Sequence, residues 1–488
     1  MSKLIIAEKP SVAKSIASAL GASSRADGFY EGNGLLVSWC VGHLVSPMDA
    51  GGYDERFKKW RYDDLPILPE PFRYVLAPGK EDAFENLRAL MDRPDVDTIV
   101  NACDAGREGE LIFRLMYEMA GCRKPVLRLW ISSMEDSAIR EGFSDLRPGA
   151  DYEALYQSAL CRQKADWLVG INATRLFSVL YHRTLNVGRV QTPTLAMLAE
   201  RDAKITLFHK EKYHLLRLTL NGAEAVSEKF TDPAEAEQAA AMCKGAAVTC
   251  TSVTKEQKKE QPPKLYDLTT LQREANRLFG YTAKQTLDYA QSLYEKKLLT
   301  YPRTDSRYLT SDMAETVSCV IHLAAKLPPF DGCGNFFPLV ETMISDKDVF
   351  DHHAIIPTME IEKADIKALP LGERNLFLLV CCKLLCASAE PYVYEAVTAT
   401  FDCGGQSFAA KGKHILSEGW REIDRIFRAF LKEKPADGDG DTLPDFTEGQ
   451  TFDGAEVSVT EHFTQPPKPY TEDTLLSAME NAGKDDIP

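Results

Sequence analysis

The chain has 488 residues, which at roughly 100 to 200 residues per domain predicts about three or four domains. Hydrophobic residues make up 44% and charged residues 26%, a composition typical of folded globular proteins that excludes collagen-like and wholly disordered chains. The net charge of -15 argues against an indiscriminate polyanion binder, since such proteins usually carry a basic excess. The apolar runs are too short for a membrane span or a signal peptide, so we expect no membrane association and a cytoplasmic location.

The first part of the chain alternates strand and helix patterns. Lys3–Ala7 predicts a buried strand and Ser11–Leu20 has apolar residues at helical spacing. Val96–Ala102 predicts a second strand, and a helix is expected from Glu110 to Ala120. Residues 1–150 therefore indicate an α/β domain with a parallel sheet.

The middle of the chain changes from helical to strand-like patterns. Asp151–Arg201 is helical in pattern, apart from a break around residues 186–188. Lys210–Val253 contains alternating strand-like runs, and the polar stretch Lys255–Lys264 predicts a linker.

A strongly helical region follows this predicted linker. Two capping-box patterns predict helix starts, Thr269 with Gln272 and Thr282 with Gln285. The second of these helices is expected to end near Leu298, and further helices should continue to about Ala389. Strands are then expected at Val393–Cys403 and Gln406–Ala410, followed by an acidic linker at Lys434–Asp445.

Charged side chains follow both early strands. Glu8 and Lys9 come after the first strand, and Asp104 and Glu108 come after the second. The carboxyl ends of parallel strands meet at one sheet edge, where convergent carboxylates suit a hard cation such as Mg²⁺. Lys9 and the nearby Arg107 could supply positive charge to a phosphoryl group. Asp, Gly and Glu are also common in solvated turns, so this group by itself fits either interpretation.

The segment Leu299–Ser306, LTYPRTDS, contains a candidate nucleophile. Tyr301 precedes a proline and therefore should lie outside a helix, and Arg303 is two residues away. A tyrosine can attack a phosphodiester when cations stabilise the developing charge. His352, in DHHAIIPT, could donate a hydrogen bond to the phosphate. The alternative is a packing tyrosine and a structural histidine.

Two further stretches could contact a sugar-phosphate backbone. The first is a glycine-containing break between helices whose backbone amides and polar side chains could face DNA. Its candidate residues are Asn186, Val187, Gly188, Arg189, Val190, Gln191 and Thr192. The second is RLWISS, with Arg128, Ser132 and Ser133 as candidates. A helix cap and core packing of Trp130 are the alternatives for these stretches.

Two function classes are disfavoured by missing motifs. No GxxxxGK[ST] loop occurs, which argues against a P-loop ATPase. A tyrosine recombinase would need HxxR, but positions 355 and 356 are both Ile.

Taken together, the motifs resemble one family. They are AEKPSVA, VGHL, DAGREGE, RLWISS, NVGRVQTPTLAM, LYDLTTLQREAN, LTYPRTDS and HHAIIPT, in this order. The chain resembles a bacterial type IA DNA topoisomerase of the topoisomerase III subfamily, and the likeness runs from Lys3 to about Gly483.

The resemblance implies a multidomain, toroidal architecture of α/β and helical domains. The implied parts are an N-terminal Toprim domain (1–150), a helical single-strand cleft domain (151–209), a β-rich hinge domain (210–264), a helical domain with the catalytic tyrosine (265–390), the return of the hinge domain (391–460) and the return of the cleft domain (461–488).

The resemblance also implies the chemistry. Tyr301 would form a 5′-phosphotyrosyl link, with Arg303 and Lys9 stabilising the scissile phosphate and His352 near it. Glu8 would serve as the acid and as a Mg²⁺ ligand, and Asp104 and Glu108 would be the other ligands. Single-stranded or negatively supercoiled DNA would be the substrate, for relaxation or decatenation without ATP, and a helicase is a candidate partner.

The sequence departs from the family pattern at two places. The usual DxDxE has Gly106 at its second acidic position, which favours a single Mg²⁺. Gln465–Lys484 resembles the return into the cleft domain but lacks the segment that would follow, which indicates a fragment or a truncated relative. Another Toprim nuclease or primase, and a non-catalytic single-strand-binding relative, are the alternative functions.

Overall fold

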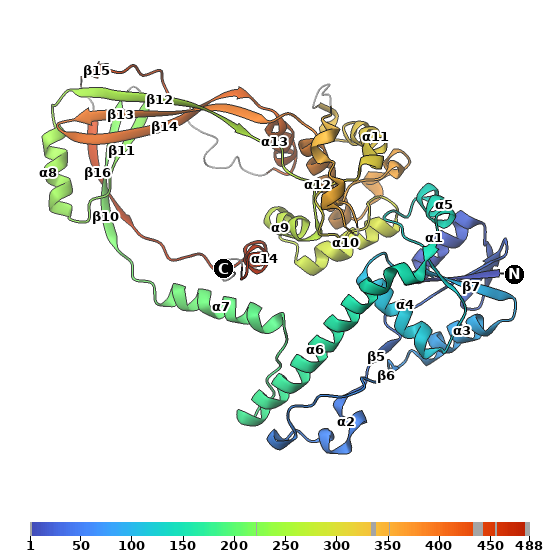
Figure 1. The fold of residues 1–488 in the computed structure, drawn as a ribbon. Coiled ribbons are helices and arrows are strands. Elements are labelled where there is room, and N and C mark those ends of the chain that lie inside the picture. The colour runs from blue at the N-terminus through green and yellow to red at the C-terminus, as the bar shows by residue number, and fades with distance from the viewer. Residues whose placement is uncertain are drawn as a thin grey trace.

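The computed structural model describes residues 2–220, 222–332, 338–350, 352–432, 443–453 and 456–483. Figure 1 shows that the chain follows a ring. It leaves an N-terminal α/β domain along two helices, crosses a β-rich arch, and returns through a helical domain that lies against the first domain. Parts that are far apart in the sequence therefore meet where the ring closes.

The N-terminal domain is built on a mixed sheet. Its strands are β1 (Ser2–Ala7), β2 (Ser24–Ala26), β3 (Phe29–Gly32), β4 (Leu35–Trp39), β7 (Val96–Ala102), β8 (Val126–Arg128) and β9 (Arg147–Pro148). The spatial order is β2-β3-β4-β1-β7-β8-β9. The four central strands are parallel, as predicted, whereas β2, β3 and β9 pair antiparallel at the edges. The edge strands are short and partly polar, which left little periodicity to detect in the sequence.

Helices cover both faces of this sheet, and β1 contributes alternate residues to each face. The helices are α1 (Pro10–Leu20), α3 (Glu81–Asp92), α4 (Arg107–Met119) and α5 (Asp136–Ser144). Leu4 and Ile6 pack in the core cluster that contains residues of α3 and α4. Ile5 and Ala7 pack in a second cluster with residues of α1 and α5. The predicted early strands and helices are thus confirmed, with α4 starting three residues earlier than expected because the turn after β7 is short.

A small insertion projects from this domain between β4 and α3. It contains β5 (Val45–Pro47), α2 (Ala50–Tyr53) and β6 (Tyr74–Leu76), with β5 and β6 paired antiparallel. Its short 3-10 turns lie at Glu55–Lys58 and Tyr62–Asp64.

Two helices lead away from the domain, as the helical pattern predicted. α6 (Glu153–Leu180) packs against α4 at its start, and α7 (Gln191–Thr206) follows the expected break. α7 has no buried residue. Among the described residues, no helix combines the length and the apolar character needed to cross a bilayer.

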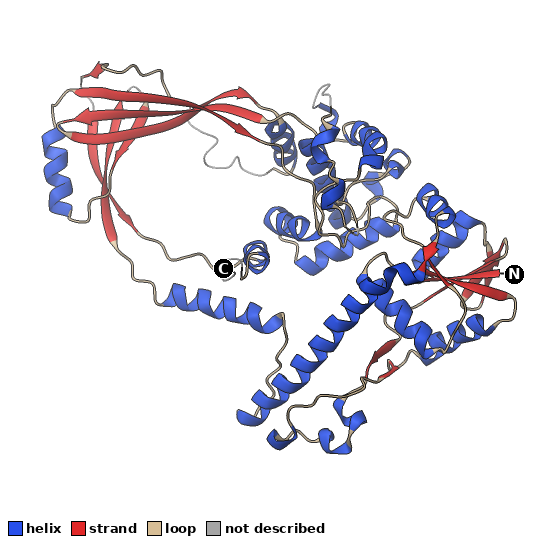
Figure 2. Ribbon diagram, in the orientation of Figure 1, coloured by secondary structure: helices blue, strands red, loops and turns tan. Residues whose placement is uncertain are grey.

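The arch is a single sheet formed by three separate parts of the chain, at residues 212–260, 392–417 and 451–463 (Figure 2). Its strands are β10 (Lys212–Leu220), β11 (Ala223–Ser227), β12 (Val248–Glu260), β13 (Tyr392–Cys403), β14 (Gln406–Ser417), β15 (Thr451–Phe452) and β16 (Glu456–Phe463). Their spatial order is β15-β12-β13-β14-β11-β10-β16, and α8 (Pro233–Cys243) packs against β10 and β16. The strand predictions for this region are confirmed, with β14 extending further than expected.

One sequence prediction in the arch is wrong. The stretch Lys255–Lys264 was expected to be a linker, but residues up to Glu260 belong to β12 and pair with β13, with Lys255 opposite Val397 and Glu260 opposite Tyr392. Cross-strand hydrogen bonds order this ribbon although most of its side chains are solvated, so its polar composition resembled that of a loop. The predicted acidic linker at 434–445 lies largely outside the described residues.

The helical domain surrounds one almost completely buried helix, α12 (Leu371–Ala387). Around it lie α9 (Leu268–Phe279), α10 (Ala283–Glu295), α11 (Ala314–Ala324) and α13 (Trp420–Phe430). The short 3-10 turns outside the insertion are Gly149–Tyr152, Ser311–Met313, Phe330–Gly332, Val340–Met343, Asp346–Asp348, Met359–Glu362 and Ile366–Ala368. α14 (Glu472–Glu480), the last described helix, packs against α9.

The two predicted capping boxes had different outcomes. Thr282 and Gln285 form the expected reciprocal box at the start of α10. At α9 the prediction is wrong, because Asp267 caps the helix by accepting from the Thr270 amide, and Thr269 lies inside the helix. α10 also ends at Glu295, earlier than the expected Leu298, and a turn at residues 296–298 and an isolated bridge from Leu299 to Pro357 follow before Tyr301.

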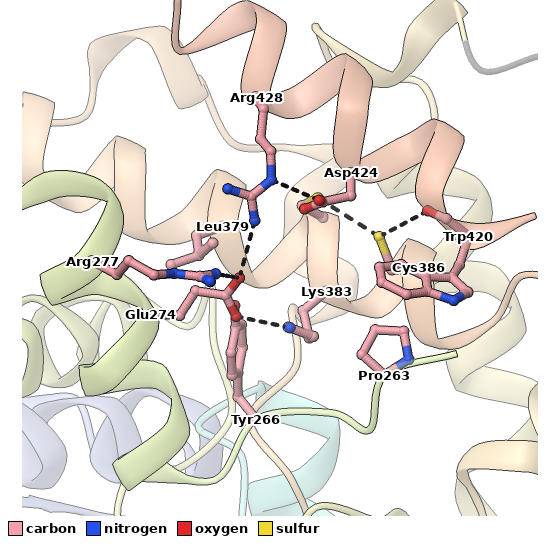
Figure 3. A pocket seen from close by; sticks show the side chains of 11 residues that line it. Pro263, Tyr266, Glu274, Arg277, Leu379, Lys383, Cys386, Trp420, Asp424 and Arg428 are labelled. Atoms are coloured by element: carbon pink, nitrogen blue, oxygen red, sulfur yellow. Dashed lines mark hydrogen bonds and ion pairs between the residues drawn. The ribbon is translucent and has the colours of Figure 1, made fainter. Parts of the chain in front are cut away.

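A mostly buried carboxylate joins three helices of this domain. Glu274 of α9 accepts a hydrogen bond from Tyr266 at 2.5 Å and pairs with Lys383 of α12 at 2.8 Å. Arg277 lies 3.0 Å and Arg428 of α13 lies 4.0 Å from the same carboxylate. Figure 3 shows these side chains converging on Glu274 around a cavity of about 250 Å³. The ion pairs therefore connect α9 to the helices on which the arch is mounted.

Replacement of this carboxylate tests its structural role. Glu274→Ala should destabilise the helical domain by about 3 kcal/mol, because it leaves the mostly buried Lys383 and the Tyr266 hydroxyl without their shared partner. Thermal unfolding measures the change. The exposed Glu315 on α11 is the matched control, and Glu315→Ala should change stability by less than about 0.5 kcal/mol. Equal effects of the two variants would contradict this account of Glu274.

Candidate active site

Tyr301 lies at the contact between the helical domain and the N-terminal sheet. Its amide donates to the Ser132 carbonyl at 3.0 Å, and its hydroxyl donates to Asp104 Oδ2 at 3.3 Å. The ring packs between Tyr294 and His352, with centroid distances of 5.4 and 4.4 Å. Tyr301 is only 6% exposed and belongs to the same apolar cluster as Ile5 and Ala7 of β1. The tyrosine of one domain thus completes the core of the other.

The parallel register of the sheet brings the two acidic turns together, as predicted. Ala7 of β1 is paired with Ala102 of β7, so Glu8 and Asp104 follow neighbouring strand ends.

A Cβ at Gly109 would lie 2.0 Å from the Asp104 carbonyl oxygen. The close approach of α4 to this turn therefore requires glycine at position 109.

Burial perturbs the ionisation of both acids and of the tyrosine. Burial, followed by repulsion from Asp104, raises the pKa of Glu8 to about 7. Burial also raises the pKa of Asp104, while Lys9 and Arg303 act in the opposite direction. Burial and the neighbouring Asp104 raise the pKa of the Tyr301 hydroxyl well above its usual range. The site thus holds a protonated tyrosine beside acids that are short of positive charge.

The predicted cations lie at the same place but differ in their surroundings. Lys9 Nζ forms an ion pair with Glu295 Oε1 of α10 at 3.2 Å. Arg303 is exposed, yet it is close enough to lower the pKa of both Glu8 and Asp104. Both cations can therefore contribute positive charge beside Tyr301.

His352 lies beside Tyr301, and its ring nitrogens contact the N-terminal domain. Nδ1 is 2.9 Å from Ser132 Oγ, and Nε2 is hydrogen-bonded to the carbonyl of Ala105. With Nε2 carrying the proton, Nε2 donates to the Ala105 carbonyl and Nδ1 accepts from the Ser132 hydroxyl. Burial lowers the pKa of His352 to about 4, so the ring is neutral at neutral pH.

Two further polar contacts flank the tyrosine and cross between the same domains. Lys297 Nζ is 2.5 Å from Asp136 Oδ1 at the start of α5. The Met359 amide donates to Glu135 Oε1 at 3.1 Å. We call these contacts, together with those of Lys9, Tyr301 and His352, the gate interface.

Of the three predicted metal ligands, the structure brings two together. Glu8 and Asp104 lie together, but the Glu108 carboxylate turns to His43, whose Nε2 is 3.6 Å away. Within the described part of the chain, no three His, Cys, Asp or Glu side chains gather closely enough to hold a metal ion. Convergence of all three predicted carboxylates is therefore not observed, because Glu108 sits on the half-exposed first turn of α4 and pairs with His43.

The prediction that Arg128 contacts DNA is wrong. Its side chain is 1% exposed and pairs with the equally buried Glu110 at 2.6 Å. It also donates to the carbonyls of Asn101, Cys103, Asp104 and Leu129. Arg128 therefore supports the turn that carries Asp104, a role that its surface-like motif did not reveal.

The two serines of RLWISS lie at the gate interface. Ser132 contacts both Tyr301 and His352 as described above. Ser133 is half-buried and donates to Glu135 at 3.2 Å. Their hydroxyls are thus held within the closed interface.

The predicted DNA-contacting turn is largely exposed. Asn186, Arg189, Val190, Gln191 and Thr192 are exposed, whereas Val187 and Gly188 are partly covered. The Thr192 hydroxyl accepts from the Gly188 amide at 3.1 Å, and Arg189 pairs with Asp166 at 2.5 Å. The turn is therefore ordered by local bonds, and most of its side chains face solvent.

A cavity of about 490 Å³ adjoins this turn, between α6 and the insertion. Trp60, Lys58, Arg175 and Asn186 are among its lining residues. Trp60 is 43% exposed, and the Arg175 guanidinium lies 5.5 Å from its ring centre. The Nε of Arg175 is buried and has no hydrogen-bond partner within the described ranges.

This insertion was not among the sites predicted from the sequence. The run FKKWRY at residues 57–62 mixes aromatic and basic side chains, a pattern typical of surfaces that stack on bases. That mixture is the signal that could have identified it.

Comparison with known proteins agrees with this arrangement. A family model for DNA topoisomerase matches residues 150–483, and a Toprim domain model matches residues 3–134. DNA topoisomerase 3 of Bacillus subtilis (strain 168) is 40% identical over 498 residues, which cover 99% of this chain and 67% of that protein. DNA topoisomerase 3 of Bacillus cereus (strain ATCC 10987 / NRS 248) is 39% identical over 514 residues, covering 99% and 68%.

The fold has a counterpart among solved structures. Full-length topoisomerase I from Thermotoga maritima superimposes with a TM-score of 0.73 at 24% identity, over 98% of this chain and 75% of that one. The Toprim match also assigns the N-terminal sheet to a metal-binding class of domain. The chain therefore belongs to the type IA DNA topoisomerases, within the topoisomerase III subfamily.

Proposed function

We propose that this topoisomerase cleaves one DNA strand with Tyr301 and that the gate interface opens to let another strand pass. The observation that carries the proposal is the buried hydrogen bond from the Tyr301 hydroxyl to Asp104, between two parts of the chain 197 residues apart. A Toprim nuclease or primase would not need a tyrosine hydroxyl hydrogen-bonded to this acid for its reaction. The bond thus supports a reaction in which the tyrosine itself takes part.

The proposed cleavage step uses the acids on either side of the nucleophile. Tyr301 Oη attacks the phosphorus while its proton passes to Asp104, its hydrogen-bond acceptor. The bond from phosphorus to the 3′-oxygen breaks, and Glu8 donates a proton to that oxygen. The 5′-phosphate is then esterified to Tyr301. Because the ester retains the bond energy, the reverse step rejoins the strand without ATP.

Positive charge beside the phosphate is proposed to come from Lys9 and Arg303. Both act on the Glu8 and Asp104 carboxylates at this sheet edge, and Arg303 is exposed where a strand could reach it. A phosphate that enters the site would gain both contacts as charge develops. His352 is proposed to donate a hydrogen bond to the phosphate when DNA displaces its contact with Ala105.

The donor set at the sheet edge fits a hard divalent cation. Glu8 and Asp104 are buried carboxylates, and their raised pKa values indicate that nearby positive charge only partly offsets their burial. These two residues would hold a single Mg²⁺, and Glu108 is proposed as a third ligand. When bound, the ion would add positive charge near the 3′-oxygen.

The proposed substrate is single-stranded DNA, including the unpaired regions of negatively supercoiled DNA. The strand would run past the turn at residues 186–192, with one base in the cavity beside Trp60 and Arg175. Because the substrate is DNA, the proposed site of action is the cytoplasm, where a helicase could supply single strands. Relaxation and decatenation both follow from passage of a strand through the gate.

The nucleophile is tested by removing one oxygen atom. Tyr301→Phe should keep its ring packing but form no covalent adduct with a 3′-labelled single-stranded oligonucleotide, because the hydroxyl is the attacking group. Denaturing gel electrophoresis detects the adduct. Tyr308→Phe, in the same segment, is the control and should form adducts normally. An adduct formed by the Tyr301 variant would rule out the assignment.

The cavity beside the turn is tested by removing its aromatic wall. Trp60→Ala should weaken single-strand binding about 5- to 100-fold, the range for loss of one stacked base. Fluorescence anisotropy with a labelled oligonucleotide measures the dissociation constant. Phe350, which is 84% exposed and lies in the helical domain, is a control position, and Phe350→Ala should leave the constant unchanged. Unaltered affinity of the Trp60 variant would remove the cavity from the DNA path.

Lys9 and Arg303 should contribute mainly to strand cleavage, and the metal site mainly to strand rejoining. Chelation of divalent ions by EDTA should suppress plasmid relaxation more than oligonucleotide cleavage, because Lys9 and Arg303 still stabilise the phosphate during cleavage. Asp104→Asn should instead suppress both activities, since the amide keeps the shape of the carboxylate but cannot take up the Tyr301 proton during cleavage. Plasmid gels and adduct yields measure the two activities. Equal loss of relaxation and cleavage on chelation would contradict the separate role of the metal ion.

A further inference from the structure

The proposed catalytic lysine is held by the opposite domain. Lys9 follows β1, and its ammonium group is 3.2 Å from Glu295 Oε1, at the end of α10. The two side chains are 30% and 28% exposed, so the pair lies at the rim of the gate interface. Lys9 therefore has a defined partner in the closed, DNA-free protein.

The last turn of α10 is built around this contact. Gln291, one turn before Glu295, donates to the same Oε1 atom at 3.1 Å. Tyr294, immediately before Glu295, packs edge-on against Tyr301. One helix turn thus carries both a wall of the tyrosine pocket and the acceptor for Lys9. The position of Glu295 is fixed relative to the nucleophile, because both groups belong to the helical domain.

We propose that Glu295 is a positioning residue that holds the Lys9 ammonium beside Tyr301 and releases it to the scissile phosphate when a strand binds. The inference rests on the proposed role of Lys9 in stabilising that phosphate. A carboxylate and a phosphodiester each carry one negative charge, so they compete for the same cation. A partly exposed ion pair is weak enough for this exchange.

The exchange also links the lysine to the gate. Glu295 and Tyr301 move with the helical domain, whereas Lys9 stays on the N-terminal sheet. Opening separates Lys9 from both Glu295 and a phosphate attached to Tyr301. Closing brings the Glu295 carboxylate and the phosphate on Tyr301 back to Lys9 at the same time. Glu295 therefore positions the Lys9 ammonium group as the cleaved DNA ends meet.

A second ion pair provides a matched control. Lys297 and Asp136 also cross the gate interface, with the same combination of charges, but neither residue contacts Tyr301, Glu8 or Asp104 within the described structure. Asp136→Asn therefore weakens closure without changing the environment of Lys9. Glu295→Gln keeps the side-chain shape and removes the competing charge.

The test is a double-mutant cycle of single-strand binding. Oligonucleotide affinity is measured by fluorescence anisotropy in the Tyr301→Phe background, which prevents covalent trapping, with Glu295→Gln, Lys9→Gln, both changes, or Asp136→Asn. We expect Glu295→Gln to tighten binding about 2- to 5-fold, as for loss of one exposed ion pair that competes with DNA. This gain should disappear when Lys9→Gln is present, and Asp136→Asn should not produce it.

Each other outcome has a distinct meaning. A gain that persists with Lys9→Gln would show simple repulsion between Glu295 and DNA, and would overturn the inference. An equal gain in Asp136→Asn would show that Glu295 acts only by holding the gate shut, and would overturn it as well. If Glu295→Gln leaves the affinity unchanged and Lys9→Gln lowers it, the positioning role of Glu295 is rejected and the proposed role of Lys9 stands. Unchanged affinity and unchanged cleavage in Lys9→Gln with Tyr301 intact would instead reject the proposed function of the lysine.

Discussion

The hydrogen bond between Tyr301 and Asp104 joins two domains that the polypeptide connects only by way of the arch. It forms where the ring closes, so closure of the ring and assembly of the site are the same event. The buried ring of Tyr301 adds apolar contact with β1 to this polar link. Separation of the domains would therefore move Tyr301 away from the acids while leaving each group on its own domain.

The acids impose the second constraint on the site. Parallel pairing of β1 and β7 places Glu8 and Asp104 side by side at a buried sheet edge, where like charges are unfavourable. Lys9 and Arg303 offset part of this cost, one from each domain. The remaining imbalance favours binding of positive charge. The edge is also rigid, because the buried pair of Arg128 and Glu110 and four backbone carbonyls hold the turn after β7 in place.

The gate interface has the character of a reversible contact. The N-terminal and helical domains have largely separate apolar cores, so neither depends on the other for most of its buried surface. The ion pairs Lys9–Glu295 and Lys297–Asp136 lie at its partly exposed rim, where such pairs contribute little net stability. The more specific contacts, those of Tyr301 and His352, are concentrated at the centre. With this division the interface could open without unfolding either domain, and its closure would depend on the contacts of Tyr301 and His352.

Much of the site could be predicted from the sequence, because strand ends and proline turns are local signals. The alternation of β1 and β7 with helices placed Glu8 beside Asp104, and the residue before Pro302 marked Tyr301 as non-helical. The motif order also led to the family. These features depend on short-range periodicity, which a sequence displays directly.

Only the tertiary structure decided which of these groups meet and which are buried. The motif predicted an exposed Arg128, but its side chain is buried against Glu110, and Glu108 at the start of α4 pairs with His43. The extension of β12 required a partner strand more than 100 residues away, and the contact of Lys9 with Glu295 required closure of the ring. Only the fold places Trp60, Arg175 and Asn186 around the same cavity. Long-range pairing, burial and rotamer choice depend on the whole fold, whereas helix periodicity, turns and motif residues are properties that the sequence determines by itself.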